Sequence, residues 1–324
     1  MQNGEKWAVR GFMNRLDAAD QILVGYNILA LVLVLLAPLK IPHQGWLFLF
    51  HLVIQAAWVK LSQFPGFNDT ASDKSNGWII LHAWIPILII IPFYSEATFL
   101  SHYFIPGNLD EWLYRTDLRL FGFDLNHALS TGQPLWLNEF FHGVYFSYYG
   151  LMVYPAVLLY RESILRFRHY LAGLILLLMV HNLLFVFLPA AGPVHLRVEL
   201  FPAGTGLLFI PLMNWIYGWG DYAGAAIPSA HVAASIFIFL SLRNQLKQAG
   251  QTVLAIWILA IFGSTVYCSY HYGIDVISGI CTGLIFYGMY LKWPWLQYKP
   301  QQNGGIRQPT TSTSFAPFAP DSAD

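Results

Sequence analysis

The second half of the sequence contains two histidines whose neighbours suit nucleophilic and acid–base chemistry. His271 precedes Asp275 by four residues in "HYGID", and on a helix this spacing places both side chains on one face. A carboxylate beside an imidazole fixes the tautomer of the ring, orients it and stabilises its cationic form. His231 follows Ser229 in "IPSAH", where Pro-Ser is typical of a helix start. Because imidazole is a competent nucleophile toward phosphorus and titrates near neutral pH, one histidine can attack while the other transfers a proton.

The composition predicts an integral membrane protein. Of the 324 residues, 56% are hydrophobic and 10% are charged, whereas soluble domains carry about 25% charged residues. The mean hydropathy of +0.49 agrees with this prediction. A net charge of zero gives no electrostatic footprint for a nucleic-acid partner. The two cysteines, Cys268 and Cys281, form neither a disulfide framework nor a metal-ligand pattern.

Eight apolar segments are predicted to cross the membrane as helices, because about 20 apolar residues span the hydrocarbon core. Their residues are uniformly apolar rather than alternating, which is typical of helices and not of barrel strands. The polar N-terminal segment does not fit a cleaved signal peptide, so the first span is expected to be retained. The last two spans are expected to be nearly continuous. The predicted spans are about residues 21–39, 46–62, 78–95, 139–160, 170–188, 229–243, 252–271 and 272–292.

Lysine and arginine between these spans set the orientation, because cytoplasmic loops are enriched in both residues. With eight crossings the basic segments all fall on one side, which is predicted to be the cytoplasm. The loops 96–138 and 189–228 and the join near residue 271 then face outward with both histidines. A bacterial inner membrane, with the site on the periplasmic face, is the simplest location. The basic residues that these segments carry are Lys6, Arg10, Arg15, Arg161, Arg166, Arg168, Arg243, Lys247, Lys292, Lys299 and Arg307.

The chain is predicted to divide into five parts. A cytoplasmic segment, residues 1–20, precedes the N-terminal membrane helices within 21–95. The outward loop 96–138 has Leu, Trp and Phe at helical spacing between charges, which favours a helix lying along the membrane surface. Residues 139–292 form the core that holds the two histidines. The tail 293–324, rich in Pro, Ser, Thr and Gly, is predicted to be disordered.

Two stretches resemble motifs of the type 2 phosphatidic acid phosphatase (PAP2) superfamily. "IPSAHVAAS" is similar to the second motif, Pro-Ser-Gly-His, with alanine in place of glycine. "STVYCSYHYGID" is similar to the third motif, Ser-Arg, five residues, His, three residues, Asp, and Ser264, His271 and Asp275 fall in its register. The resemblance covers about residues 139–292 and implies an all-α membrane fold of about eight transmembrane helices with a six-helix core bundle. It looks closest to the branch containing the inositol phosphorylceramide synthases, which transfer phosphoinositol between lipids.

The resemblance implies a role for each matched residue. His271 becomes the phosphorylated nucleophile, Asp275 orients it, and His231 protonates the leaving alcohol and later deprotonates the acceptor. Ser229 and nearby backbone N–H groups hold phosphate oxygens, as helix N-termini do, and Ser264 belongs to the same phosphate-binding group. The implied substrate is a membrane phospholipid, and the acceptor is a lipid, a polyol or water. Neither a metal nor a cofactor is expected.

Other positions depart from the family pattern. Thr265 stands where the third motif has arginine, a loss that the synthase branch shares. The first motif, a lysine followed seven residues later by Arg-Pro, does not occur in that form. The best positional match is "LPAAGPVHLR", in which Arg197 is the cation and His195 lies close to it. Asp221, near the second motif, is a candidate contact for a polar headgroup, although a solvated loop acid explains it as simply.

Three alternatives stay open on the sequence alone. A transporter could use His271 and Asp275 as a proton relay, but it would carry ionisable groups through several spans at mid-depth instead of at one boundary. A catalytically inactive relative could bind lipid, and a zinc ion could bind His231, His271 and Asp275 with one open position. The same residues serve a phosphatase and a phosphotransferase, although the extra early spans favour transfer. The headgroup, the acceptor and the oligomeric state are equally open.

Overall fold

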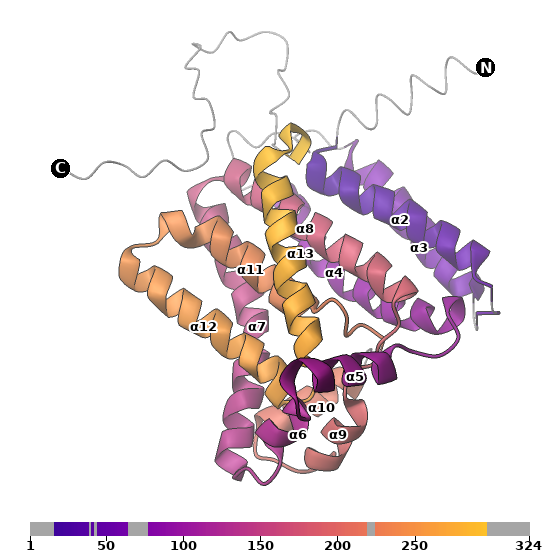
Figure 1. Ribbon diagram of the computed structural model, residues 1–324. Coiled ribbons are helices and arrows are strands. Elements are labelled where there is room, and N and C mark those ends of the chain that lie inside the picture. The colour runs from indigo at the N-terminus through magenta and orange to yellow at the C-terminus, as the bar shows by residue number, and fades with distance from the viewer. Residues whose placement is uncertain (1–15, 39, 42–43, 64–76, 219–223, 297–324) are drawn as a thin grey trace.

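The computed structural model describes residues 16–38, 40–41, 44–63, 77–218 and 224–296, and these residues form helices joined by loops. The helices are α2 (Ala18–Leu36), α3 (Gln44–Leu61), α4 (Gly77–Phe104), α5 (Asp110–Phe121), α6 (Leu125–Ser130), α7 (Leu135–Glu162), α8 (Ile164–Phe187), α9 (Val194–Leu200), α10 (Phe209–Gly218), α11 (Ala230–Leu242), α12 (Gln248–Tyr267) and α13 (Gly273–Lys292), with the 3-10 helices η1 (Arg243–Gln245) and η2 (Pro294–Leu296). Figure 1 shows the long helices in one bundle, with the short helices α5, α6, α9 and α10 gathered at one end.

Each of the eight predicted spans corresponds to one helix, and the all-helical prediction is confirmed for the described residues. Among them, α2, α4, α8, α12 and α13 are long and apolar enough to cross a membrane. α11 has 13 residues, which gives about 20 Å at about 1.5 Å per residue, less than the thickness of the hydrocarbon core. α3 and α7 carry polar residues such as His51 and His142 among their apolar ones. The count of eight spans and the six-helix core therefore stay predictions.

The last two predicted spans, 252–271 and 272–292, are not nearly continuous as expected. α12 ends at Tyr267, and a loop separates it from α13. Ser269 adopts the left-handed conformation with φ of 57°, so the helix cannot continue through it. The N–H groups of residues 270 and 271 both donate to the Thr265 carbonyl oxygen, at 3.0 and 3.1 Å, and complete the helix end. His271 consequently lies in a loop and not on a helix.

The N-terminal helices α2 and α4 pack against α8, and a buried charged cluster joins the three. Arg168 of α8 donates to the Asp17 carboxylate from Nε, and to Asp20 Oδ1 from Nη2 at 3.0 Å. His82 of α4 shares the Asp20 carboxylate, with its Nε2 3.0 Å from both oxygens. These four side chains are at most 10% exposed. The buried charged groups of this cluster are therefore stabilised by one another and not by water.

α8 has more of its apolar surface buried than the other candidate spans, with 72% of its most apolar window inside the protein. It also packs against α7, α11 and α13. Figure 1 shows it between the N-terminal helix α2 and the helices α11 and α13. α8 thus connects two halves of the bundle, the N-terminal helices α2 and α4 and the later helices α7, α11 and α13.

α11 and α13 approach each other closely because two glycines of α13 face α11. A Cβ atom on Gly279 would lie 2.6 Å from the carbonyl oxygen of Ser229, and one on Gly283 would lie 2.7 Å from that of Ala233. Real Cβ atoms essentially never come so close to a backbone atom. Two glycines four residues apart allow this backbone approach between membrane helices. The packing brings the first turn of α11 beside the first turn of α13.

Replacing Gly283 with valine is expected to lower the thermal unfolding midpoint of the purified protein in detergent. The valine side chain would overlap the α11 backbone, and overpacking of this kind costs about 1–3 kcal/mol. Gly288→Val is the matched control on the same helix, because a Cβ atom there meets nothing within 4 Å. Equal midpoints for the two variants would contradict the close approach of α11 and α13.

Candidate active site

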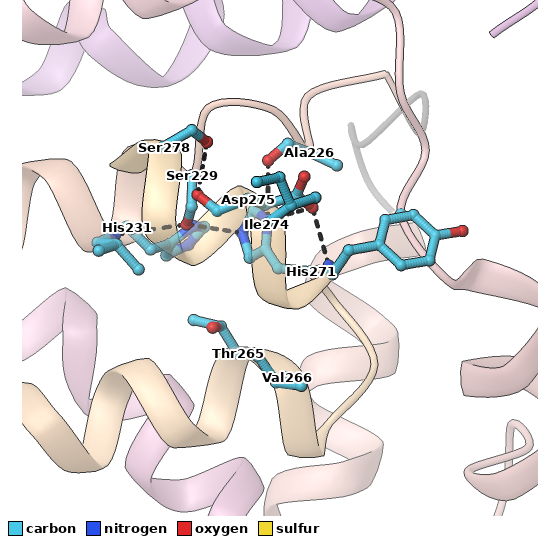
Figure 2. A network of polar contacts seen from close by, with 12 residues as sticks. Ala226, Ser229, His231, Thr265, Val266, His271, Ile274, Asp275 and Ser278 are labelled. Carbon is cyan, nitrogen blue, oxygen red and sulfur yellow. Dashed lines mark hydrogen bonds and ion pairs between the residues drawn. The ribbon is translucent and has the colours of Figure 1, made fainter. Parts of the chain in front are cut away.

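The loop between α12 and α13 turns His271 back toward the start of α11. Figure 2 shows His231, Ser229, His271 and Asp275 gathered where this loop meets α13. Asp275 lies in the first turn of α13, and its Oδ2 accepts the Tyr272 N–H at 2.8 Å. His271 and Asp275 therefore meet across a helix start, and not as neighbours on one helical face as the spacing had predicted.

His271 has a polar partner at each ring nitrogen. Its Nδ1 lies 2.9 Å from the carbonyl oxygen of Ala226, and because a carbonyl only accepts, the neutral ring carries its hydrogen on Nδ1. The bare Nε2 then accepts the hydroxyl hydrogen of Ser229, at 3.2 Å. The Asp275 Oδ2 is 3.6 Å from Nδ1, longer than a hydrogen bond. The Ala226 carbonyl thus fixes the tautomer directly, while Asp275 supplies a negative charge beside the ring.

Ser229 joins the starts of two helices at the site. As the N-cap of α11 its hydroxyl accepts the Val232 N–H at 3.4 Å, and its own N–H donates to the Asp275 carbonyl oxygen at 3.1 Å. The side chain is fully buried. The first turn of α11 therefore directs backbone N–H groups at the space beside His271, and such helix starts bind phosphate oxygens.

His231 stands in the first turn of α11, half-buried, with its ring centroid 5.6 Å from that of His271. Its Nε2 lies 3.1 Å from the Tyr145 hydroxyl, and that hydroxyl also contacts the Tyr217 hydroxyl. The Tyr148 ring packs on the imidazole at 4.4 Å. If one imidazole attacks a phosphorus atom here, the other imidazole is close enough to give a proton to the leaving oxygen.

Arg197 approaches this site from α9 through a stack of tyrosine rings. Tyr270 stacks on Tyr145 and on Tyr217, with ring centroids 4.1 and 4.6 Å apart. The guanidinium carbon of Arg197 lies 4.7 Å from the centroid of Tyr270 and 4.8 Å from that of Tyr217. These distances are typical of cation–π contacts. The structure therefore places a positive charge beside the aromatic group that touches His231.

Sequence reasoning missed the tyrosines as members of the site. Tyr145 and Tyr148 fall one helical turn apart on α7, a spacing that packing explains equally well. Tyr270 resembles an interfacial aromatic by its position between two spans. The structure instead buries Tyr270, at 5% exposure, within the ring stack. A usable signal was the alignment of Tyr145 and Tyr148 at the membrane depth expected for His231.

The remaining predicted residues differ in what the structure shows of them. The Ser264 hydroxyl is buried and donates to the Ile261 carbonyl oxygen in its own helix at 2.7 Å, so its phosphate-binding role stays a prediction. The Thr265 hydroxyl donates to the Phe262 carbonyl oxygen in the same way, at 2.8 Å. His195 is exposed on α9. Asp221 lies outside the described residues.

A metal centre was one alternative for the same residues. Among the described residues, no group of three or more His, Cys, Asp or Glu is arranged to hold a metal ion. Both ring nitrogens of His271 already face oxygen atoms of Ala226 and Ser229. This donor set favours a nucleophile held in one tautomer.

Comparison with known proteins gives one result for this chain. A family model described as PAP2 superfamily matches residues 111–289, more than half of the 324 residues. The match begins in α5, well before the resemblance around residues 139–292, and it includes Ser229, His231, His271 and Asp275. Searches of curated proteins and of solved structures returned no match. The chain belongs to the PAP2 superfamily.

Proposed function

We propose that this protein transfers the phospho-headgroup of a membrane phospholipid to a hydroxyl acceptor by double displacement. Membership of the PAP2 superfamily supports a phosphatase-type lipid function in general, and the five apolar helices support a location in a membrane. The observation that carries the proposal is the contact between Nδ1 of His271 and the Ala226 carbonyl oxygen, which assigns the ring hydrogen to Nδ1. The Nε2 of His271 then bears a lone pair and lies beside the Ser229 hydroxyl, with the His231 ring 5.6 Å from its own.

In the first displacement, Nε2 of His271 attacks phosphorus and a P–N bond forms. The bond from phosphorus to the leaving oxygen breaks, and that oxygen takes a proton from protonated His231. The attack leaves a positive charge on the His271 ring, which the Ala226 carbonyl and the nearby Asp275 carboxylate stabilise. The Ser229 hydroxyl turns from Nε2 to a phosphate oxygen.

In the second displacement, the acceptor hydroxyl gives its proton to His231 and its oxygen attacks phosphorus. The P–N bond breaks, and His271 returns to its neutral form with a hydrogen on Nδ1. Arg197 and the first turn of α11 would offset the negative charge of the phosphate oxygens in both steps. The proton that His231 lost in the first displacement is restored in the second.

The acceptor decides between transfer and hydrolysis. Ser229 and Asp275 are fully buried and His271 is 3% exposed, so bulk water has little access to the phosphorylated ring. The resemblance to the inositol phosphorylceramide synthase branch also supports a lipid or polyol hydroxyl as the acceptor. From the basic residues of its loops, we place the site on the outward face of the membrane, with a bacterial inner membrane as the simplest case.

The test is product analysis with purified protein in detergent under chelator. Fluorescent-tailed phosphatidic acid and phosphatidylinositol are supplied together with diacylglycerol and ceramide, and the products are resolved by chromatography. Fluorescent diacylglycerol and a new phospholipid built on the acceptor, without free phosphate, are expected from the native protein and not from His271→Ala. That variant should lose at least about 10³-fold in rate, because removal of a nucleophile eliminates the covalent route.

Each other outcome has a defined meaning. Free phosphate that disappears in the His271→Ala variant would make water the acceptor and the protein a lipid phosphatase. Activity that needs a divalent metal ion would contradict the metal-independent mechanism. Undiminished turnover by His271→Ala would overturn the proposal.

A further inference from the structure

The helices α5 and α6 send polar side chains to the loop that carries His271. The Asp117 carboxylate of α5 is 3% exposed and accepts the Gly273 N–H on Oδ2 at 2.6 Å and the Ile274 N–H on Oδ1 at 2.8 Å. The amide nitrogen of Asn126, on α6, donates to the His271 carbonyl oxygen at 2.9 Å and to that of Val266 at 2.8 Å. Backbone groups before, at and after the histidine are therefore bound by two side chains of these helices.

A second acid of α5, Asp110, binds the backbone segment that contacts Ala226. Asp110 accepts the Ala191 N–H on Oδ2 at 3.0 Å and the Gly192 N–H on Oδ1 at 2.8 Å. The adjacent Ala190 carbonyl accepts the Ala226 N–H at 2.9 Å. The Ala226 carbonyl is the group that accepts the Nδ1 hydrogen of His271. Asp110 thus supports the partner of the ring, while Asp117 and Asn126 support its backbone.

The contacts between these segments leave little room for movement. A Cβ atom on Gly273 would lie 2.5 Å from the Phe121 ring of α5. Gly192 has a φ of +75°, and a Cβ atom on it would lie 2.5 Å from the Tyr270 carbonyl oxygen. Only glycine fits both places without displacement. The loops are therefore packed directly on α5 and on each other.

The two acids occupy one face of α5, since residues seven apart are separated by two helical turns. Burial raises the pKa of the Asp110 and Asp117 carboxyl groups, and the N–H contacts offset this only in part. An exposed side of the same helix carries Glu111, which forms an ion pair with Arg115. Carboxyl groups whose pKa is shifted by burial beside a specific partner are frequent at functional sites.

We propose that α5 and α6 position the nucleophile, with Asp117 and Asn126 fixing the backbone around His271 and Asp110 fixing the carbonyl that sets its tautomer. This inference rests on the proposed role of His271 as nucleophile. None of the three residues touches the reacting phosphorus, so they are positioning residues. A displacement of the ring by about 1 Å costs on the order of 10²-fold in rate, and this is the scale of effect that the contacts control.

The experiment compares Asp117→Asn with Glu111→Gln in the full-length protein. Both exchanges remove one negative charge from α5, but only the first alters a contact with the His271 loop. Asp117→Asn is expected to lower the rate of phosphorylation of His271 by about 10- to 100-fold, with KM changed less than about twofold. Hydrogen exchange of the 273 and 274 amides should accelerate in the same variant. Glu111→Gln should match the native protein in all three measurements.

Asn126→Ala provides a second route if Asp117→Asn does not fold, and the same fall in rate at constant KM is expected. Fast exchange with an unchanged phosphorylation rate would overturn the positioning role. Unchanged exchange would show that the Asp117 contacts do not hold the loop. A native protein that forms no phosphohistidine would contradict the proposed function instead, and the exchange measurement would still test the contacts because it needs no substrate.

Discussion

An enzyme carrying His231→Gln is expected to accumulate phosphorylated His271 when its substrate has an acidic leaving group such as nitrophenol. Such a group departs without a proton, so the first displacement stays fast. The second displacement still requires removal of the acceptor proton, and loss of a general base slows it by about 10²- to 10⁴-fold. A burst of nitrophenol equal to the enzyme concentration, followed by slow turnover, is the expected measurement. An acid-labile phosphate on His271, identified by mass spectrometry, should accompany it.

Natural phospholipids should give a different result with the same variant. Their leaving alcohol needs the proton of His231, so both displacements slow and no burst is expected. His127→Gln, at an exposed position on α6, is the control and should behave as the native protein. His271→Gln should give no burst with either substrate. Equal losses of turnover on both substrates without any burst would refute the acid–base role of His231.

The variant Arg168→Met is expected to lose about 3–5 kcal/mol of stability, because a buried charge pair is broken from one side only. Removing the guanidinium leaves the Asp17 and Asp20 carboxylates, 6% and 0% exposed, without its positive charge, while the His82 ring still contacts Asp20. The side chain also connects α2 and α4 to α8, so its loss should loosen the N-terminal helices. The thermal unfolding midpoint in detergent, and the yield of folded protein, measure the effect.

Arg166→Met is the matched control, two residues away on the same helix. Its ion pair with Glu162 has both side chains about half exposed, at 46% and 48%, and exposed pairs contribute about 0–1 kcal/mol. The unfolding midpoint should therefore change little. If both variants unfold at the same temperature, the buried cluster does not stabilise the packing of α2, α4 and α8.

Much of the helical architecture was predictable, because apolar runs specify helices by composition alone. Each of the eight predicted spans has its helix. The ends were less predictable, since they depend on single residues. The predicted spans meet at residues 271 and 272, whereas α12 ends at Tyr267 and α13 begins at Gly273, because of the left-handed Ser269 and two N–H bonds to the Thr265 carbonyl oxygen. No pattern of apolar residues contains that information.

The candidate site was likewise predictable in part: the motif residues were identified from the sequence, and the groups that hold them were not. Ser229, His231, His271 and Asp275 were predicted together, because the chain spaces them as the family motifs do. Their proximity in the structure agrees with that grouping. The Ala226 carbonyl at Nδ1 of His271 was not predictable, because a backbone group leaves no mark in the residue pattern. Asp117 and Asn126 were also missed, since contacts across about 150 residues depend on the packing of α5 and α6 and not on local spacing.

The position of α8 between the two halves of the bundle bears on how this chain can vary over evolutionary time. Its residues meet α2 and α4 as well as α7, α11 and α13, so few of them face lipid, where one apolar side chain can replace another freely. A substitution there must suit two sets of neighbours at once. We expect α8 to tolerate fewer random substitutions than α12, which has 39% of its window buried. The N-terminal helices α2 and α4 could therefore diverge or be exchanged only if the α8 residues that contact them change in step.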